Sequence, residues 1–214
     1  MNIGNGSYPD DSPDARCIIL DMEMAVIGKE AATKITYGEF RQFPDDGKLY
    51  ELIHGEVRVA PAPNTKHQTA HSNLFVSLGP HVKANRLGVV FSAPFDVRLD
   101  IDSAVQPDLI FISNARAEII LEDYIDGAPD LVVEILSPST AAYDRAAKLA
   151  LYAEAGVPWV WLVDPQAKTV EILKIEGRKY IVHSILAAHQ VLISSLFPGW
   201  QLPLDDLFDF RTQF

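Results

Sequence analysis

The apolar positions of this chain fall into short strand-like runs and helix-like intervals, in an order that predicts a mixed α/β fold. Residues 129–136 (PDLVVEIL) are nearly all apolar, which is typical of a central strand covered on both faces. A helical pattern follows and ends at Gly156, before the helix breaker Pro158 and the apolar run VPWVWLVDP. Strand, helix and strand of these lengths predict a crossover unit with parallel strands and a right-handed connection.

The segments upstream predict shorter elements. A short helix is expected to begin at Thr36, and LYELIHGEVRVAP predicts a β-hairpin that turns at His54 and Gly55. Residues 65–85 have apolar side chains at helix-like intervals, so we expect one helix, kinked or straight, although Gly79 and Pro80 interrupt it. The runs VVFSAPFDVRLD and PDLIFIS predict two strands that pair in antiparallel orientation.

The helix after residue 136 is expected to take Ser139 or Thr140 as its N-cap. The last third of the chain predicts a strand meander. A loop then places Phe197, Trp200 and Leu202 against the body of the domain.

Length and composition indicate one folded domain. The chain has 214 residues, of which 48% are hydrophobic, as in ordinary globular domains. Residues 1–32 are at first rich in Gly, Pro, Asp and Ser and have only a short apolar patch, so they predict a flexible N-terminal extension. The folded domain is expected to span residues 33–214.

Charge and cysteine content limit the classes of function. A net charge of -11 opposes tight binding of nucleic acid through bulk charge, so such a role needs a local basic groove or a metal ion. The single Cys17 excludes an intrachain disulfide. No apolar stretch approaches the ~20 residues of a membrane span, and the N-terminus has no secretory pattern. We therefore expect a cytoplasmic protein that does not contact membranes.

Two acidic residues interrupt apolar strands. Asp108 begins the run DLIFI, and Glu134 lies inside LVVEIL. A buried charge costs several kcal/mol unless it is paired, protonated or bound to a metal ion. Mg²⁺ prefers oxygen ligands and is often held by one or two carboxylates, so the pair predicts a metal site. The alternative is structural: Asp108 terminates its strand, and Glu134 pairs with an arginine such as Arg98.

The motifs follow one another as in a known family. The segments YELIHGE, HQTAHSNL, QPDLIFI, APDLVVEILSPST, DRAAKLALYAEAGV and PWVWLVDP together resemble the Uma2 family, a domain of unknown function (DUF820). That family is similar to the PD-(D/E)XK nucleases, and the resemblance covers about residues 33–207. It implies the restriction endonuclease-like α/β fold, in which a central mixed β-sheet is flanked by helices and carries a metal site on its strands.

The resemblance also implies roles for single residues. Asp108 matches the Asp of the PD element, and Glu134 matches the acid of the second element. The superfamily has a lysine two residues after that acid, where this chain has Leu136. Members of Uma2 resemble a variant in which the lysine comes from the following helix, and Lys148 is then the candidate. The alternative is that Lys148 pairs with Asp144 across one turn of a solvated helix face.

Two further positions match the family. Glu51 corresponds to an additional N-terminal acid, whereas Glu56 is expected to be solvated at the hairpin. His67 stands where the family also has a histidine, either to contact phosphate or a metal-bound water or to make a structural hydrogen bond. A zinc site formed by His67 and His71 is disfavoured, because the residue after the first histidine is Gln68 rather than the glutamate of zinc proteases.

These inferences predict a metal-dependent endonuclease that hydrolyses DNA. Asp108, Glu134 and the carbonyl of Ile135 are expected to bind Mg²⁺ or Mn²⁺, while Lys148 supports the charge that develops on the phosphate. The alternative is a catalytically inactive nuclease fold that acts as a binding or interaction module, which the missing lysine at Leu136 and the net charge of -11 both favour. A homodimer is a further expectation, because cutting both strands of a duplex needs two sites.

Overall fold

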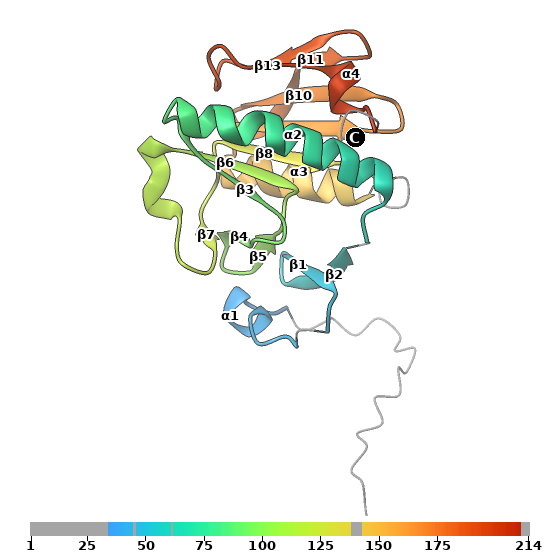
Figure 1. Ribbon diagram of the computed structural model, residues 1–214. Helices are drawn as coiled ribbons and strands as arrows, with labels where there is room; N and C mark the ends of the chain where they lie inside the picture. The colour runs from blue at the N-terminus through green and yellow to red at the C-terminus, as the bar shows by residue number, and fades with distance from the viewer. Residues whose placement is uncertain (1–33, 45, 61, 138–142, 211–214) are drawn as a thin grey trace, which may run out of the picture. The chain divides into compact units, whose positions relative to one another are not determined.

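The computed structural model of the protein describes residues 34–44, 46–60, 62–137 and 143–210 (Figure 1). The N-terminal extension expected at residues 1–32 lies outside the described residues, and so do the expected helix caps Ser139 and Thr140. These expectations, and the domain boundary at residue 33, stay predictions. None of the helices in the described ranges is long and apolar enough to cross a membrane.

A six-stranded mixed sheet lies at the centre of the fold, in the order β11-β10-β9-β8-β6-β3. Its strands are β3 (Gly88–Ser92), β6 (Leu109–Ser113), β8 (Leu131–Ile135), β9 (Trp159–Asp164), β10 (Thr169–Glu176) and β11 (Lys179–Leu186). The neighbours β8 and β9 are parallel, and the other pairs are antiparallel. Helix α3 (Tyr143–Ala155) connects the parallel pair, so the predicted strand, helix and strand are confirmed.

Helix α2 (Thr65–Ala84) is continuous through Gly79 and Pro80. Its N-cap is Asn64, whose side chain accepts a hydrogen bond from the His67 N–H at 3.0 Å. One helix was expected here, and the structure confirms it. The apolar side chains spaced four residues apart form its buried face: Ala70, Leu74, Leu78 and Val82.

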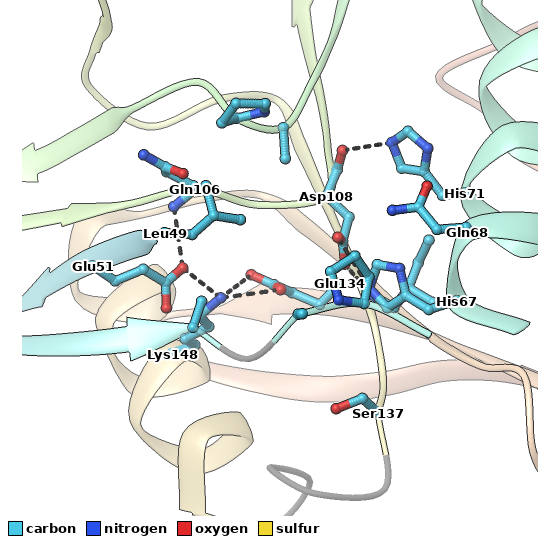
Figure 2. A pocket seen from close by; sticks show the side chains of 16 residues that line it. Leu49, Glu51, His67, Gln68, His71, Gln106, Asp108, Glu134, Ser137 and Lys148 are labelled. Atoms are coloured by element: carbon cyan, nitrogen blue, oxygen red, sulfur yellow. Dashed lines mark hydrogen bonds and ion pairs between the residues drawn. The ribbon is translucent and has the colours of Figure 1, made fainter. Parts of the chain in front are cut away.

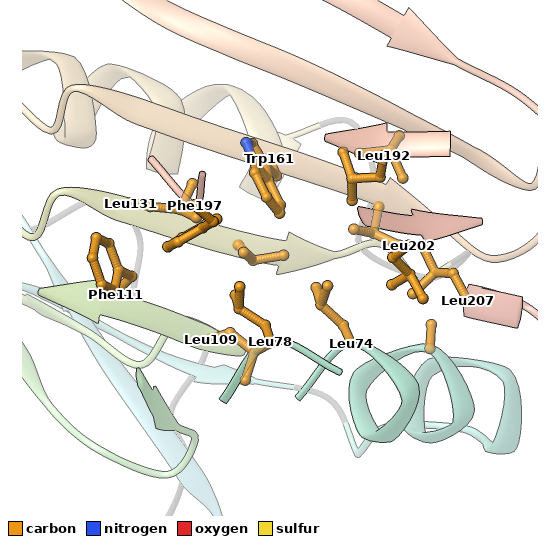
Figure 3. Packing of buried hydrophobic residues seen from close by; sticks show 14 of the residues in the cluster. Leu74, Leu78, Leu109, Phe111, Leu131, Trp161, Leu192, Phe197, Leu202 and Leu207 are labelled. Atoms are coloured by element: carbon orange, nitrogen blue, oxygen red, sulfur yellow. The ribbon is translucent and has the colours of Figure 1, made fainter. Parts of the chain in front are cut away.

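The helices α2 and α3 cover opposite faces of the six-stranded sheet (Figure 1). Because strand side chains alternate between faces, Leu131, Val133 and Ile135 of β8 pack in the cluster that contains α2. Val132 packs instead in the cluster that contains α3. Figure 3 shows the α2-side cluster, in which Leu74 and Leu78 lie beneath strand side chains. The sheet is therefore buried on both sides, as the apolar run predicted.

A second sheet of five strands has the order β2-β1-β5-β4-β7. Its strands are β1 (Leu49–Ile53), β2 (Glu56–Ala60), β4 (Val97–Asp100), β5 (Ser103–Val105) and β7 (Ile125–Asp126). The hairpin turn between β1 and β2 has φ of 50° at His54 and 80° at Gly55, which matches a type I′ turn. The predicted hairpin is confirmed, and so is the short helix α1 (Tyr37–Phe40) with Thr36 as its N-cap.

The prediction of one strand for VVFSAPFDVRLD is wrong. The run divides into β3 and β4, which belong to different sheets. Pro94 lies between them, and a proline cannot donate a ladder hydrogen bond. Pairing of β3 with β6 is antiparallel, as expected, whereas β4 pairs with β5, a short strand between the two predicted runs.

The C-terminal part completes the α2-side core. After the hairpin β10–β11 come β12 (Val191–Ile193), β13 (Gln201–Pro203) and helix α4 (Leu204–Leu207), while the 3₁₀ helix η1 (Asn114–Ile119) follows β6. Phe197, Trp200 and Leu202 are buried, which confirms the predicted meander and loop. The side-chain amide of Asn73 lies within 3.1 Å of the carbonyl oxygens of Asp206, Leu207 and Asp209 and ties this segment to α2.

Candidate active site

A pocket of about 260 Å³ lies where β8 ends, between α2, α3 and the five-stranded sheet. All of the site residues expected from the sequence line it (Figure 2): Glu51, His67, Asp108, Glu134, Ile135 and Lys148. They come from β1, α2, the segment before β6, β8 and α3. The fold thus brings together side chains that are far apart in the sequence.

Glu134 points from β8 toward α3 and is held there by two side chains. Its carboxylate accepts hydrogen bonds from the Lys148 ammonium, 3.2 Å from each oxygen, and from the Tyr152 hydroxyl. Lys148 and Tyr152 are four residues apart and therefore share one face of the helix. The alternative partner Arg98 binds Asp126 instead, with Nε at 2.7 Å, so the expected Glu134–Arg98 pair is wrong.

Lys148 directs its ammonium into the pocket. Nζ lies 2.7 Å from Glu51 Oε1 and 3.2 Å from Glu134 Oε2, and only 16% of the side chain is exposed. The solvated helix face of the alternative interpretation does not fit this burial. The side chain of Asp144, the partner in that interpretation, lies outside the described residues.

Glu51 links the five-stranded sheet to this cluster. Its side chain is buried on β1, and Oε1 also accepts a hydrogen bond from the Gln106 N–H at 3.2 Å. Glu56 is exposed at the hairpin and pairs with Arg58 at 3.6 Å, in line with the expectation that it is solvated. Of the two N-terminal acids, Glu51 is the one that reaches the pocket.

Asp108 connects β8 to α2. Its Oδ2 accepts a hydrogen bond from the Ile135 N–H at 2.6 Å, and its Oδ1 lies 3.2 Å from Nε2 of His67. Because a carboxylate is an acceptor, this contact places the imidazole proton on Nε2. The other ring nitrogen of His67, Nδ1, is buried and has no hydrogen-bond partner among the described residues.

Burial and neighbouring charges set the protonation of the cluster. Burial raises the pKa of Glu134 to about 7; the charges of Asp108 and Glu51 act in the same direction, and Lys148 and Tyr152 oppose them. Burial alone would lower the pKa of Lys148, but Glu134 and Glu51 outweigh it and raise that pKa above its usual range. Lys148 therefore stays charged at neutral pH, whereas Glu134 is poised between its two forms.

The donor chemistry of the pocket fits a hard divalent cation. Three carboxylates and one ammonium line the pocket, and two of the carboxylates contact the ammonium, so the ionised pocket has an excess of negative charge. Within the described part of the chain, no group of three His, Cys, Asp or Glu side chains is arranged to hold a metal ion. Mg²⁺ needs only one or two carboxylates and fills its other positions with water and phosphate. Asp108 and Glu134 meet that requirement, and a metal role for the Ile135 carbonyl stays a prediction.

The paired histidines of α2 do not form a zinc site. Nε2 of His71 lies 2.9 Å from Ser92 Oγ and 3.2 Å from the Asp108 carbonyl oxygen, so this ring is engaged with β3 and the backbone before β6. Burial also lowers the pKa of His71. His67 contacts the carboxylate of Asp108 instead.

Two residues of the site were not predicted. Tyr152 binds Glu134, and its spacing of four residues from Lys148 was the available signal. Gln106 lies two residues before Asp108 and holds Glu51 through its backbone N–H; its side-chain Nε2 donates to Asp96 at 2.7 Å. A glutamine before a strand has no signal of its own in the sequence.

Comparison with known proteins agrees with this architecture. The Uma2 family model, described as "Putative restriction endonuclease", matches residues 37–205. No curated protein matches the chain. The structure is similar to the crystal structure of a "putative nuclease belonging to DUF820" from Anabaena variabilis, with a TM-score of 0.68 and 23% sequence identity over 81% of this chain and 97% of that chain. The fold is restriction endonuclease-like, as the resemblance predicted.

Proposed function

Since the chain belongs to the Uma2 family, we propose that it is a metal-dependent endonuclease that hydrolyses phosphodiester bonds in DNA. The observation that carries the proposal is the buried ammonium of Lys148, held between Glu51 and Glu134 in the pocket that Asp108 also lines. A cation and clustered carboxylates in one pocket suit phosphoryl chemistry, because both a metal ion and the phosphate can be bound there.

Asp108, Glu134 and the carbonyl of Ile135 would hold Mg²⁺ or Mn²⁺. When bound, the metal supplies a polarised phosphate and a water of lowered pKa. Asp108 is kept in place for this role by the Ile135 N–H and by His67. Each contact supplies a hydrogen-bond donor to one carboxylate oxygen and so fixes the orientation of the side chain.

Lys148 would stabilise the charge that develops on the phosphate. Its amine stays protonated, and its long side chain can move from the carboxylates toward a phosphate oxygen over a short distance. Glu51 acts through Lys148 and is a positioning residue, since its carboxylate lies 2.7 Å from the ammonium. The usual superfamily lysine, absent at Leu136, is thus replaced in this proposal by a lysine from α3.

The competing function is a binding module without catalysis. The absence of a lysine at residue 136 favoured it, but the position of Lys148 in the pocket weakens that support. The net charge of -11 still favours it, because an acidic protein repels DNA away from any local site. A direct assay separates the two functions.

The test is cleavage of supercoiled plasmid and of single-stranded DNA in Mg²⁺ and in Mn²⁺. We expect Asp108→Ala to lower the cleavage rate by at least about 10²-fold, the cost of losing one preorganised electrostatic group. Asp205→Asn is the matched control, because Asp205 is exposed and pairs with His189 outside the pocket. Full activity of Asp108→Ala would exclude the proposed site.

Calorimetric titration with Mg²⁺ provides the second readout. A metal-dependent nuclease binds the ion, and Glu134→Ala weakens that binding because it removes one of two carboxylate ligands. If the protein binds no divalent ion and cuts neither substrate, the competing function, a binding module without catalysis, is supported instead.

A further inference from the structure

The pocket lined by Asp108, Glu134 and Lys148 is called the catalytic pocket below, after its proposed role. A second hollow lies beside it and has a different lining. Its volume is about 320 Å³, within the range of ligand sites. Three segments form its walls: the start of α2, the turn between β9 and β10, and the chain after α4. The lining residues are Thr65, Lys66, Thr69, Pro165, Gln166, Lys168, Phe208 and Phe210, with no acid among them. In a chain of net charge -11, such a lining is unusual.

The two hollows are neighbours at one edge of the sheet. Strands β8 and β9 are parallel, and Ile135 pairs in register with Val163, so both strands end at the same edge. The catalytic pocket lies where β8 ends, and the second hollow lies at the turn after β9. Adjacent strands are about 4.8 Å apart. A ligand that leaves the first pocket therefore has a short path to the second.

Helix α2 separates the hollows with its first two turns. His67 and His71 line the catalytic pocket, whereas Thr65, Lys66 and Thr69 line the second hollow. Side chains advance by 100° per residue around a helix, so these two sets point to different sides of it. An extended ligand would pass across the N-terminal end of α2.

The walls of the hollow are fixed by hydrogen bonds. Asp164 Oδ1 accepts from the N–H groups of Gln166 and Ala167 at 2.8 and 2.9 Å, which shapes the turn after β9. Lys66 Nζ donates to Gln166 Oε1 at 2.7 Å and joins that turn to α2. The contacts of Asn73 with carbonyl oxygens at the end of α4 and at Asp209 hold the third wall.

Lys66 and Lys168 face no carboxylate in the lining of the hollow. In the described part of the chain neither forms an ion pair, in contrast to Lys48 and Lys148. Asp205, whose carboxylate interacts electrostatically with Lys168, is itself paired with His189. Both ammonium groups are thus available to an anionic ligand.

The hollow also has an aromatic ring, that of Phe210, beside its two lysines. Phe210 is 59% exposed at its rim. Exposed aromatic rings beside lysines are the combination by which proteins bind single-stranded nucleic acid, since the bases stack and the cations contact the backbone. A ring can reach the face of a base only where that base is unstacked from its neighbours.

We propose that this hollow binds a nucleotide of a single-stranded DNA segment that continues from the catalytic pocket. Lys66 and Lys168 contact the phosphates, and Phe210 stacks on the base. The inference rests on the proposed nuclease function and adds to it a substrate class: DNA that is single-stranded next to the cleavage site.

The test measures binding without cleavage. Fluorescence anisotropy of a labelled thymidine oligonucleotide of about 12 nucleotides, within the span of known single-strand surfaces, is recorded in EDTA over a series of salt concentrations. We expect the double variant Lys66→Gln/Lys168→Gln to bind at least about 10-fold more weakly and to lower the salt slope by about 1.4, the value for two phosphate contacts. Phe210→Ala should weaken binding at least about 5-fold.

The matched control is Lys83→Gln/Lys179→Gln, which removes the same charge at exposed positions outside both hollows. Lys83 lies on the same helix, about 25 Å further along its axis than Lys66. We expect this control to bind like the wild type, and circular dichroism establishes that all variants fold. Equal loss of affinity in the two double variants would overturn the inference, and so would a Phe210→Ala variant that binds the oligonucleotide as the wild type does.

The proposed function and this inference can fail separately. Asp108→Ala retains the second hollow, so loss of cleavage with intact oligonucleotide binding supports both. If the wild type cuts no DNA but the Lys66→Gln/Lys168→Gln variant still loses binding, the nuclease function is excluded and the hollow remains a DNA-binding site.

Discussion

Glu134 is the carboxylate that binds both Lys148 and Tyr152 of α3. Only 14% of its side chain on β8 is exposed, and its two partners lie on the same face of α3. A buried carboxylate needs such partners because losing water costs it several kcal/mol. The position of this acid within the apolar run LVVEIL made the cost visible in the sequence, but not the identity of both partners.

The Tyr152 hydroxyl is expected to stabilise the folded protein through Glu134. Tyr152→Phe removes a hydrogen bond to a charged group while keeping the ring, so we expect the free energy of unfolding to fall by about 1.5–3 kcal/mol in urea denaturation. Tyr180→Phe is a comparison variant, because the Tyr180 hydroxyl donates to a neutral carbonyl, that of Val157 at 2.7 Å. We expect Tyr180→Phe to lose less free energy of unfolding than Tyr152→Phe. A larger loss in Tyr180→Phe would show that the hydrogen bond to Glu134 is not the stronger one.

The raised pKa of Glu134 predicts how stability changes with pH. Between the ordinary value of 4.5 and about 7, the folded metal-free protein keeps a proton that the unfolded chain releases. The folded state then binds more protons, so its stability decreases as pH rises through this window and is lowest above it. The variant Glu134→Gln has no carboxyl proton to release, so its stability lacks this contribution to the pH dependence.

Urea unfolding of both proteins in EDTA, on either side of the window, measures the effect. The stability of the wild type relative to Glu134→Gln should fall from the acidic side to the alkaline side. A constant difference would mean that Glu134 titrates at the same pH in the folded and unfolded chains.

At the scale of elements, helix α2 is the one that both hollows share. It is a single helix although Pro80 lies inside it. Proline has no N–H to donate to the carbonyl four residues earlier, here that of Val76, and costs about 3 kcal/mol relative to alanine in a helix interior. The buried face of α2, which includes Leu74, Leu78 and Val82, offsets that cost through core packing.

Pro80→Ala is therefore expected to stabilise the protein. The variant regains a helical hydrogen bond but loses the restriction that proline places on the unfolded chain, so we expect a net gain of about 1–2 kcal/mol in urea denaturation. Oligonucleotide binding should not change, because Pro80 lines neither hollow. A loss of stability would mean that the backbone at this position is fitted to proline.

The sequence predicted most elements because their signals are local. The parallel pair β8–β9, the helix between them and the first hairpin follow from apolar periodicity and turn residues. The division of residues 88–105 between two sheets was missed, because a strand's partner is decided by distant segments rather than by its own pattern.

The site could be predicted in part, and for a different reason. Asp108 and Glu134 stand out as acids in apolar strands, and Lys148 and Glu51 came from the family resemblance. Tyr152 gave only the weak signal of its spacing from Lys148, because a tyrosine on a helix next to the core is ordinarily a packing residue. Only the folded arrangement reveals that its hydroxyl binds a carboxylate.

At the scale of the whole molecule, the distribution of charge matters more than its sum. The net charge is -11, yet the lining of the second hollow includes two lysines and no acid. The first pocket is the opposite case, because three carboxylates and one lysine line it. A divalent ion would reduce the repulsion between that pocket and a phosphate backbone.

Metal binding is therefore expected to stabilise the folded protein. A ligand that binds only the folded state raises the unfolding temperature, by an amount that grows with its concentration over Kd. We expect Mg²⁺ to raise the Tm of the wild type in differential scanning calorimetry at a pH above 7. The same titration should leave the Tm of Asp108→Ala nearly unchanged, and equal shifts in the two proteins would place the bound metal elsewhere.

The contacts of Asn73 with the end of α4 and with Asp209 have a practical consequence for handling the protein. They hold Phe208 and Phe210 against the start of α2, so any polypeptide that continues past Phe210 sets out from the rim of the second hollow. A C-terminal affinity tag would follow only four residues later, after Phe214, so a polyhistidine or acidic tag can reach the hollow and add its own charge to it. Purification with a cleavable tag at the other terminus keeps that artefact out of every DNA-binding measurement.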